Sequence, residues 1–276
     1  MKSAVRNYAE YRAGIDRDIL GRFVVPSSRL GEFADASRAM LERGAGSVPW
    51  CLTVLVGDDL AEARRAILEF TSTHMSDSEG GHSLCDSVEM RARDEQQMTE
   101  AVKAFQRPLH QFFEVSLEPG FERTLETVSS LRASAKVRTG GVTPDAFPSS
   151  ETIVRFVAKC NELGIPFKAT AALHHPLCGT YPLTYATSAP RATMYGYVNL
   201  FLASAFIRKG IAEDDARAIL DESSTNAFSF RESGVSWRGN ELNRDDLRMT
   251  RSRLFTSFGS CSFREPVDEA RELGLI

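Results

Sequence analysis

The sequence predicts a single-domain (β/α)8 barrel of the TIM type. Three observations support this fold class. Short β-rich runs alternate with helical stretches along the chain, eight such runs fit into 276 residues, and several runs carry charged side chains on one face. A doubly wound open sheet is the alternative, because alternation does not show that a sheet closes. Buried strands of an open parallel sheet are nearly continuous apolar runs, so the charged faces favour the barrel.

The eight predicted strands are short and recur along the chain. They are RFVVPS (22–27), WCLTVLVG (50–57), SVEMRA (87–92), QFFEVSL (111–117), AKVRTGG (135–141), PFKATAAL (166–173), AFSFRES (227–233) and FTSFGSC (255–261). Helical patterns lie between and after them. They cover 35–44, 60–74, 94–106, 121–132, 149–164, 194–210, 212–223, 243–254 and 265–274.

The helix predicted at 149–164 shows the expected spacing and end signals. Its apolar residues lie three or four apart, at Ile153, Phe156, Val157 and Cys160. Ser149 or Ser150 can cap its first turn, and Gly164 can end it.

We expect one domain over residues 1–276, with an N-terminal extension at 1–20. The segment 178–200 is long for a barrel loop and carries four tyrosines. It is a candidate lid over the active site. It could equally be a contact between subunits of a homo-oligomer, because exposed aromatic residues often mark interfaces.

Composition argues against several classes of partner. The net charge is −4 and basic residues form no stripe, so we expect no nucleic-acid partner. No apolar run approaches the roughly 18 residues that span a bilayer, and the N-terminal residues lack the apolar core of a signal peptide. The five cysteines form no CxxC pair. We therefore expect reduced thiols, a cytoplasmic protein and no zinc site built from cysteines.

Charged side chains share one face on four neighbouring predicted strands. Because side chains alternate across a strand, the apolar partners pack on helices and the charged faces point into the barrel. The inward set is Glu89, Arg91, Glu114, Lys136, Arg138 and Lys168. Four cations against two carboxylates predict an anionic substrate, such as a phosphate or a carboxylate. The alternative is a structural network of ion pairs that fills the barrel.

Lys168 is the predicted chemical centre of this set. Burial and a neighbouring cation lower the pKa of a lysine, and a neutral amine can form a Schiff base with a carbonyl substrate. Lys136 would supply the second positive charge, and Glu114 could relay protons. The competing role for Lys168 is that of a permanent cation that holds a phosphate or carboxylate.

The segments AKVRTGG, FPSSETIVRFVAKC and GIPFKATAALHHPL carry a family resemblance. They resemble an uncharacterised bacterial (β/α)8-barrel family with the patterns K-x-R-T-G-G and F-K-A-T-A-x-L-H-H-P, and FGSCSFREP fits the same family. Lys168 is also similar to the Schiff-base lysine of class I aldolases of the deoxyribose-phosphate aldolase type. Those enzymes have K-T-S-T-G on the sixth strand and a second lysine on the seventh. This chain has K-A-T-A, and its second lysine, Lys136, is on the predicted fifth strand.

His174 and His175 follow the sixth predicted strand, at the end of a barrel where active sites lie. Adjacent residues on an extended chain point in opposite directions, so one histidine can act as a general acid or base while the other caps the loop. A divalent metal held by His174 or His175 with Glu89 and Glu114 is the alternative, although no cofactor is our first expectation.

Small and hydroxyl residues at strand ends are candidates for binding the substrate anion. They are Thr139, Gly140, Gly141, Thr170, Ser257, Gly259 and Ser260. A turn alone would also explain the glycine pair. Cys178 and Cys261 are expected to be small buried or loop residues, because nothing beside them in the sequence marks a nucleophile.

The leading function predicted from the sequence is a lysine-dependent lyase or aldolase that acts on a small anionic carbonyl metabolite. An isomerase or lyase that works through a metal-stabilised enolate is the second possibility, with Glu89 and Glu114 as ligands and Lys168 as base. A non-catalytic barrel that binds small anions or serves as a partner subunit is the third, because barrels host many chemistries.

Overall fold

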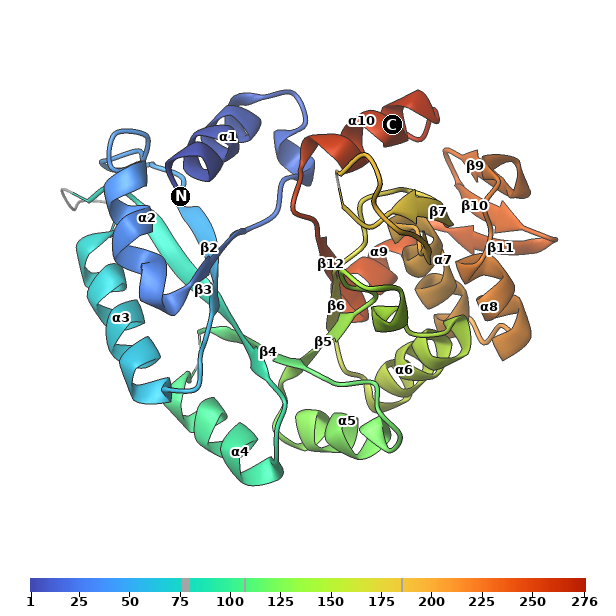
Figure 1. Ribbon diagram of the computed structural model, residues 1–276, viewed down its shortest axis with the longest axis horizontal. Coiled ribbons are helices and arrows are strands. Elements are labelled where there is room, and N and C mark those ends of the chain that lie inside the picture. Colours follow the sequence, from blue (N-terminus) through green and yellow to red (C-terminus); the bar gives the residue numbers. More distant parts are fainter. Residues whose placement is uncertain (76–79, 107, 185) are drawn as a thin grey trace. The chain divides into compact units, whose positions relative to one another are not determined.

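The computed structural model describes residues 1–75, 80–106, 108–184 and 186–276 (Figure 1). The chain divides into two compact units, Met1–Phe113 (unit 1) and Glu114–Ile276 (unit 2). Short 3-10 helices occur in both units. They span Arg17–Ile19, Ser27–Arg29, Pro144–Ala146 and Thr225–Ala227.

Unit 1 combines parallel strands with helices that follow them in the chain. Its strands are β1 (Phe23–Pro26), β2 (Trp50–Leu55), β3 (Ser83–Arg91) and β4 (His110–Glu114), whose last residue begins unit 2. Its helices are α1 (Lys2–Ala13), α2 (Leu30–Ser37), α3 (Leu60–Thr73) and α4 (Glu95–Ala104). In Figure 1, α2, α3 and α4 follow one another along one side of β2 and β3.

Local signals in the sequence explain the elements of unit 1. The Asp59 carboxylate accepts a hydrogen bond from the Glu62 amide and so caps α3. The apolar face of α3 is buried, including Ile67 and Phe70. Strand β2 pairs in parallel with β1 on one side and with β3 on the other. Its residue Leu52 is fully buried.

Unit 2 contains a second run of parallel strands. Strand β6 (Phe167–Thr170) pairs with β5 (Ser134–Arg138) on one side and with β12 (Phe255–Gly259) on the other. The helices of unit 2 are α5 (Phe121–Ser130), α6 (Ser150–Leu163), α7 (Tyr197–Arg208), α8 (Glu213–Leu220), α9 (Arg244–Arg253) and α10 (Arg264–Glu272).

The core of unit 2 is aromatic where β6 meets its neighbours. The rings of Phe167 and Phe255 stack with centroids 5.0 Å apart, and Phe156 of α6 meets Phe167 edge to face at 5.3 Å. The predicted end signals of α6 are confirmed. Ser149 Oγ accepts from the Thr152 amide, and Gly164 takes the left-handed conformation at the C-cap.

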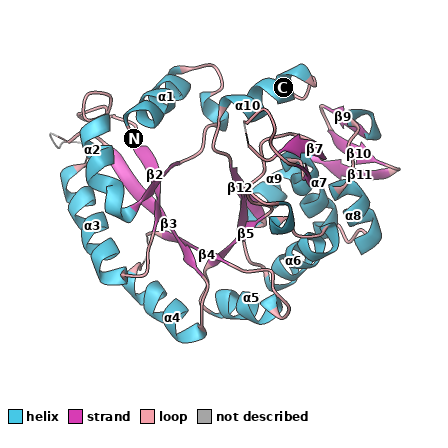
Figure 2. Ribbon diagram, viewed as in Figure 1, coloured by secondary structure: helices cyan, strands magenta, loops and turns pink. Residues whose placement is uncertain are grey.

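Two small antiparallel sheets complete unit 2. Strands β7 (Gly179–Pro182) and β8 (Arg191–Met194) form a hairpin within the candidate lid segment 178–200, of which residue 185 lies outside the described residues. Strands β9 (Phe228–Arg231), β10 (Gly234–Trp237) and β11 (Asn240–Asn243) form the other. Figure 2 shows β9, β10 and β11 apart from β5, β6 and β12.

The prediction of a closed eight-stranded (β/α)8 barrel is wrong. Seven strands pair in the order β1-β2-β3-β4-β5-β6-β12, and within the described residues β1 and β12 are the two ends of that order. The predicted seventh strand, 227–233, becomes β9 of the antiparallel sheet. Arg238 and Gly239 have φ values of 45° and 81° between β10 and β11, as a two-residue hairpin turn requires, so this region folds on itself.

Among the described residues, no helix has both the length and the apolar character needed to cross a membrane.

Candidate active site

Two buried lysines lie side by side on the strands of unit 2. Lys136 of β5 and Lys168 of β6 are register partners, and their exposed fractions are 9% and 7%. Because register partners of neighbouring parallel strands point to the same side, both lysine side chains extend from the same face of the sheet. Neighbouring strands are about 4.8 Å apart, so the two side chains start close together. The alternate residues Val137 and Ala169 are fully buried on the other face. The predicted pairing of the two lysines on neighbouring strands is therefore present.

Glu114 supplies a carboxylate to this lysine pair. Its Oε2 lies 2.9 Å from Lys136 Nζ, and the two side chains are 23% and 11% exposed. The Val115 amide donates to the Lys136 carbonyl oxygen, which fixes the chain after Glu114 next to β5. The site thus holds a paired lysine, Lys136, directly beside Lys168.

Polar groups that could receive a substrate lie around Lys168. Thr170 shares its strand face, and Thr170 Oγ1 is buried with no hydrogen-bond partner among the described residues. Ser257 of β12 is the register partner of Lys168 and is exposed, and Gly259 is the partner of Thr170. Arg138, at the end of β5, is also exposed. A buried hydroxyl without a partner is an unfavourable arrangement that a bound ligand can relieve.

The loop after β6 has a strained backbone. Ala171 and Ala172 have φ values of 69° and 58°, a region that residues with a Cβ rarely adopt. Thr139 Oγ1 donates to the Ala171 carbonyl oxygen at 2.6 Å. A Cβ on Gly140 would lie 2.7 Å from the Ala172 Cβ, so only glycine fits there. These two predicted anion-binding residues therefore have contacts of their own, which fix the loop that leads to the histidines.

Gly141, the neighbouring predicted residue, is closely packed in the same way. A Cβ there would lie 2.6 Å from the Ala146 Cβ. A role of Thr139, Gly140 and Gly141 in binding an anion stays a prediction.

His174 and His175 contact two carboxylates of α10. His174 Nδ1 lies 3.3 Å from Glu265 Oε2 and 3.1 Å from Ser260 Oγ. His175 Nδ1 lies 2.6 Å from Glu269 Oε2. Glu265 and Glu269 are four residues apart on one helix, so both histidines meet the same face of α10.

Aromatic residues enclose the second histidine and the start of α10. The Tyr181 ring, from β7 of the segment 178–200, stacks on His175 with centroids 3.4 Å apart. Tyr197 donates to the Pro266 carbonyl oxygen, and burial raises the pKa of Tyr197 to about 12. A phenol with that pKa stays neutral at physiological pH and acts as a fixed donor. The contact of Tyr181 with His175 brings the candidate lid to this loop, but closure of the segment stays a prediction.

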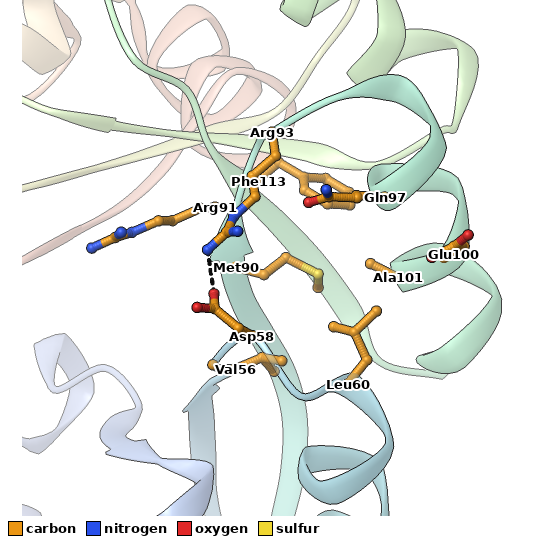
Figure 3. Close-up of a pocket in the computed structure, with 11 residues that line it drawn as sticks. Val56, Asp58, Leu60, Met90, Arg91, Arg93, Gln97, Glu100, Ala101 and Phe113 are labelled. Atoms are coloured by element: carbon orange, nitrogen blue, oxygen red, sulfur yellow. Dashed lines mark hydrogen bonds and ion pairs between the residues drawn. The ribbon is translucent and has the colours of Figure 1, made fainter.

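Glu89 and Arg91 of the predicted set belong to unit 1. Glu89 is buried on β3, and Arg91 is exposed at the end of that strand. Arg91 borders a pocket of about 600 Å³ whose other polar residues include Arg93 and Asp58, which form an ion pair (Figure 3). In Figure 3, Arg91 points to the opposite side of β3 from Met90. The other residues that line this pocket include Val56, Leu60, Gln97, Glu100, Ala101 and Phe113.

In the part of the chain that the structure describes, no three His, Cys, Asp or Glu side chains gather closely enough to hold a metal ion.

Sequence reasoning missed the partners of the histidines. Glu265, Glu269 and Tyr181 contact them, and Cys261 Sγ lies 3.7 Å from His174 Nδ1. The sequence shows nothing beside Cys261 that marks a nucleophile, whereas the fold places His174 next to its thiol. About 90 residues separate His174 from α10, so no local pattern could have linked them.

Comparisons of this chain with protein-family models, with curated proteins and with solved structures gave no match. The resemblances to a bacterial barrel family and to class I aldolases therefore stay predictions based on the quoted motifs.

Proposed function

We propose that the chain is a lyase or aldolase that acts on a small anionic carbonyl compound through a Schiff base on Lys168. The observation that carries this proposal is the register pairing of two buried lysines, Lys136 and Lys168, of which Lys136 is held by Glu114. A scaffold gains little from two adjacent buried cations, whereas an imine-forming site can use them.

The arrangement supports different roles for the two lysines. Glu114 stabilises the charged form of Lys136, and the charge on Lys136 disfavours a second charge on the neighbouring amine. Burial acts in the same direction on Lys168. We assign the nucleophile to Lys168 on these two grounds, because only the neutral amine attacks a carbonyl carbon.

The proposed reaction balances without an oxidant or a reductant. Lys168 Nζ forms a bond to the substrate carbonyl carbon, and the carbonyl oxygen leaves as water. A base takes the proton of the hydroxyl group on the β carbon, the bond between the carbons α and β to the iminium carbon breaks, and the β carbon leaves as an aldehyde. The electron pair of the broken bond moves toward the iminium nitrogen to give an enamine. A proton donor returns a proton to the α carbon, and water releases the product. Glu114 and His174 or His175 are the candidates for these proton transfers.

Groups around the lysines would hold the substrate anion. Arg138 is exposed at the end of β5, Ser257 is exposed in the middle of β12, and the Thr170 hydroxyl is buried without a partner among the described residues. We propose Arg138, Ser257, Gly259 and Ser260 as the anion site, which fits a phosphate or carboxylate. The five cysteines are free thiols, which supports the further proposal of a cytoplasmic location.

Imine trapping tests the proposal. The protein is incubated with keto acids, aldehydes and sugar phosphates, borohydride is added, and intact mass is recorded. We expect a stable adduct that depends on one carbonyl compound and disappears in Lys168→Met. Lys209→Met is the matched control, because Lys209 is an exposed lysine that pairs with Asp246 on the surface.

Two further measurements, chelator treatment and anion binding, separate the two alternatives. Activity that a chelator abolishes, without any trapped adduct, would favour the metal-assisted enolate reaction. Binding of the anion with neither an adduct nor turnover would favour a non-catalytic binding protein.

A further inference from the structure

Cys261 lies beside a histidine that is itself paired with a carboxylate. Cys261 Sγ is 3.7 Å from His174 Nδ1 and 3.9 Å from Nε2, and Cys261 is exposed. Glu265 Oε2 lies 3.3 Å from His174 Nδ1, so Nε2 is the ring nitrogen that is left to take the thiol proton. A thiol next to an imidazole can pass its proton to the ring, and the carboxylate stabilises the imidazolium that forms.

The other four cysteines have a different environment. Cys85, Cys160 and Cys178 are buried, and burial raises the pKa of the Cys85 thiol to about 12 and that of Cys178 to about 11. Burial also raises the pKa of Cys160 and of the partly exposed Cys51. Buried thiols with raised pKa values are inert. Within the described residues, Cys261 is thus the one cysteine that combines exposure with a neighbouring histidine.

We propose that Cys261 is a modification site, a thiol activated by His174 that peroxides oxidise to a sulfenic acid. The thiolate sulfur attacks one oxygen of hydrogen peroxide, so that an S–O bond forms and the O–O bond breaks. The leaving hydroxide takes the proton from His174 and becomes water. The sulfur is oxidised by two electrons and the peroxide is reduced.

The thiol proposal and the Schiff-base proposal share one residue, His174, but they are tested by separate experiments. His174 is a proposed proton-transfer residue, so a sulfenic acid beside its ring would change the partner of that ring. His175 lies next to His174, and it contacts the titratable groups of Glu269 and Tyr181. Failure of imine trapping would leave the thiol proposal standing, and the reverse also holds.

The first arm of the test measures thiol nucleophilicity. The full chain is alkylated with iodoacetamide from pH 5.5 to 9, and each cysteine is followed by peptide mapping. At pH 6.5 we expect iodoacetamide to alkylate Cys261 of the native chain about 10-fold faster than glutathione. In His174→Gln, we expect alkylation of Cys261 to be about 10-fold slower than in the native chain. Glu265→Gln should slow the alkylation of Cys261 by a smaller factor than His174→Gln does. Cys51, read from the same digests, serves as the internal control and should not respond.

The second arm measures oxidation. The protein is treated with hydrogen peroxide in the presence of dimedone, which labels sulfenic acids. We expect the label on Cys261, none in Cys261→Ser, and less in His174→Gln and Glu265→Gln. The proposal fails if alkylation of Cys261 follows the pH profile of glutathione and is the same in both variants. It also fails if Cys261 alkylates rapidly but gives no sulfenic acid.

Discussion

One ion pair from each unit shows two different surroundings. In unit 1, Arg93 and Asp58 pair at the edge of a pocket, with side chains 44% and 82% exposed. In unit 2, Lys136 and Glu114 pair at 2.9 Å with side chains 11% and 23% exposed, beside a second buried lysine. Water solvates the first pair, whereas the second loses much of its hydration. The Lys136–Glu114 pair therefore lies in surroundings that oppose folding, which is expected of a functional site.

Breaking each pair gives the largest expected contrast. Glu114→Gln removes one partly buried carboxylate from the Lys136 ammonium, and we expect the free energy of unfolding to fall by about 2–4 kcal/mol. Asp58→Asn in unit 1 should cost about 0–1 kcal/mol, because that pair is solvated. Urea denaturation of both variants measures the two losses.

A double variant tests whether the loss in stability comes from the buried charge that Glu114→Gln leaves on Lys136. Glu114→Gln with Lys136→Met removes both charges and should recover much of the loss. Equal losses in Glu114→Gln and Asp58→Asn would contradict the comparison.

Glycine substitutions give the next largest contrast. Gly140→Ala in unit 2 places a Cβ 2.5 Å from the Phe147 ring and 2.7 Å from the Ala172 Cβ, so we expect a loss of about 1–3 kcal/mol. Gly31→Ala in unit 1 lies in helix α2 with nothing within 4 Å of the new Cβ. It should gain about 0.4–1 kcal/mol. Thermal unfolding of the two variants in one buffer compares them, and a neutral Gly140→Ala would show that the loop after β6 is not fixed by this contact.

A histidine of unit 1 gives the smallest effect. His74 stacks on Phe70 and its Nδ1 lies 2.8 Å from the Phe70 carbonyl oxygen. Burial lowers the pKa of His74, so the unfolded chain binds the proton more readily than the native chain. Stability should therefore decline as the pH falls from about 6.5 toward the lowered pKa. Urea midpoints at pH 7.5 and 5.5 should differ less in His74→Gln, and an unchanged difference would remove His74 as the cause.

Most of the parallel strands were predictable, because the short β-rich runs at β1 to β6 and at β12 are strong local signals. The fate of 227–233 was not. A strand pattern does not state its partner, and the turn that directs β10 and β11 into a hairpin uses Arg238-Gly239 instead of the usual Asn-Gly. Closure of a barrel depends on contacts between distant strands, which alternation cannot report.

The lysine pair was predictable for a physical reason. Alternation placed Lys136 and Lys168 opposite apolar neighbours, and their strands proved to be adjacent in register. The carboxylates of α10 and the thiol of Cys261 were not predictable, because they reach the histidines only through the tertiary fold.

The position of a trapped adduct decides whether Lys168 is the nucleophile. The native chain is reduced with borohydride in the presence of the carbonyl compound that gives an adduct, and the digest is mapped by mass spectrometry. We expect one modified lysine, Lys168, and an unmodified Lys136, whose ammonium group is paired with Glu114. An adduct on Lys136, or one spread over surface lysines such as Lys209 at equal yield, would contradict the account.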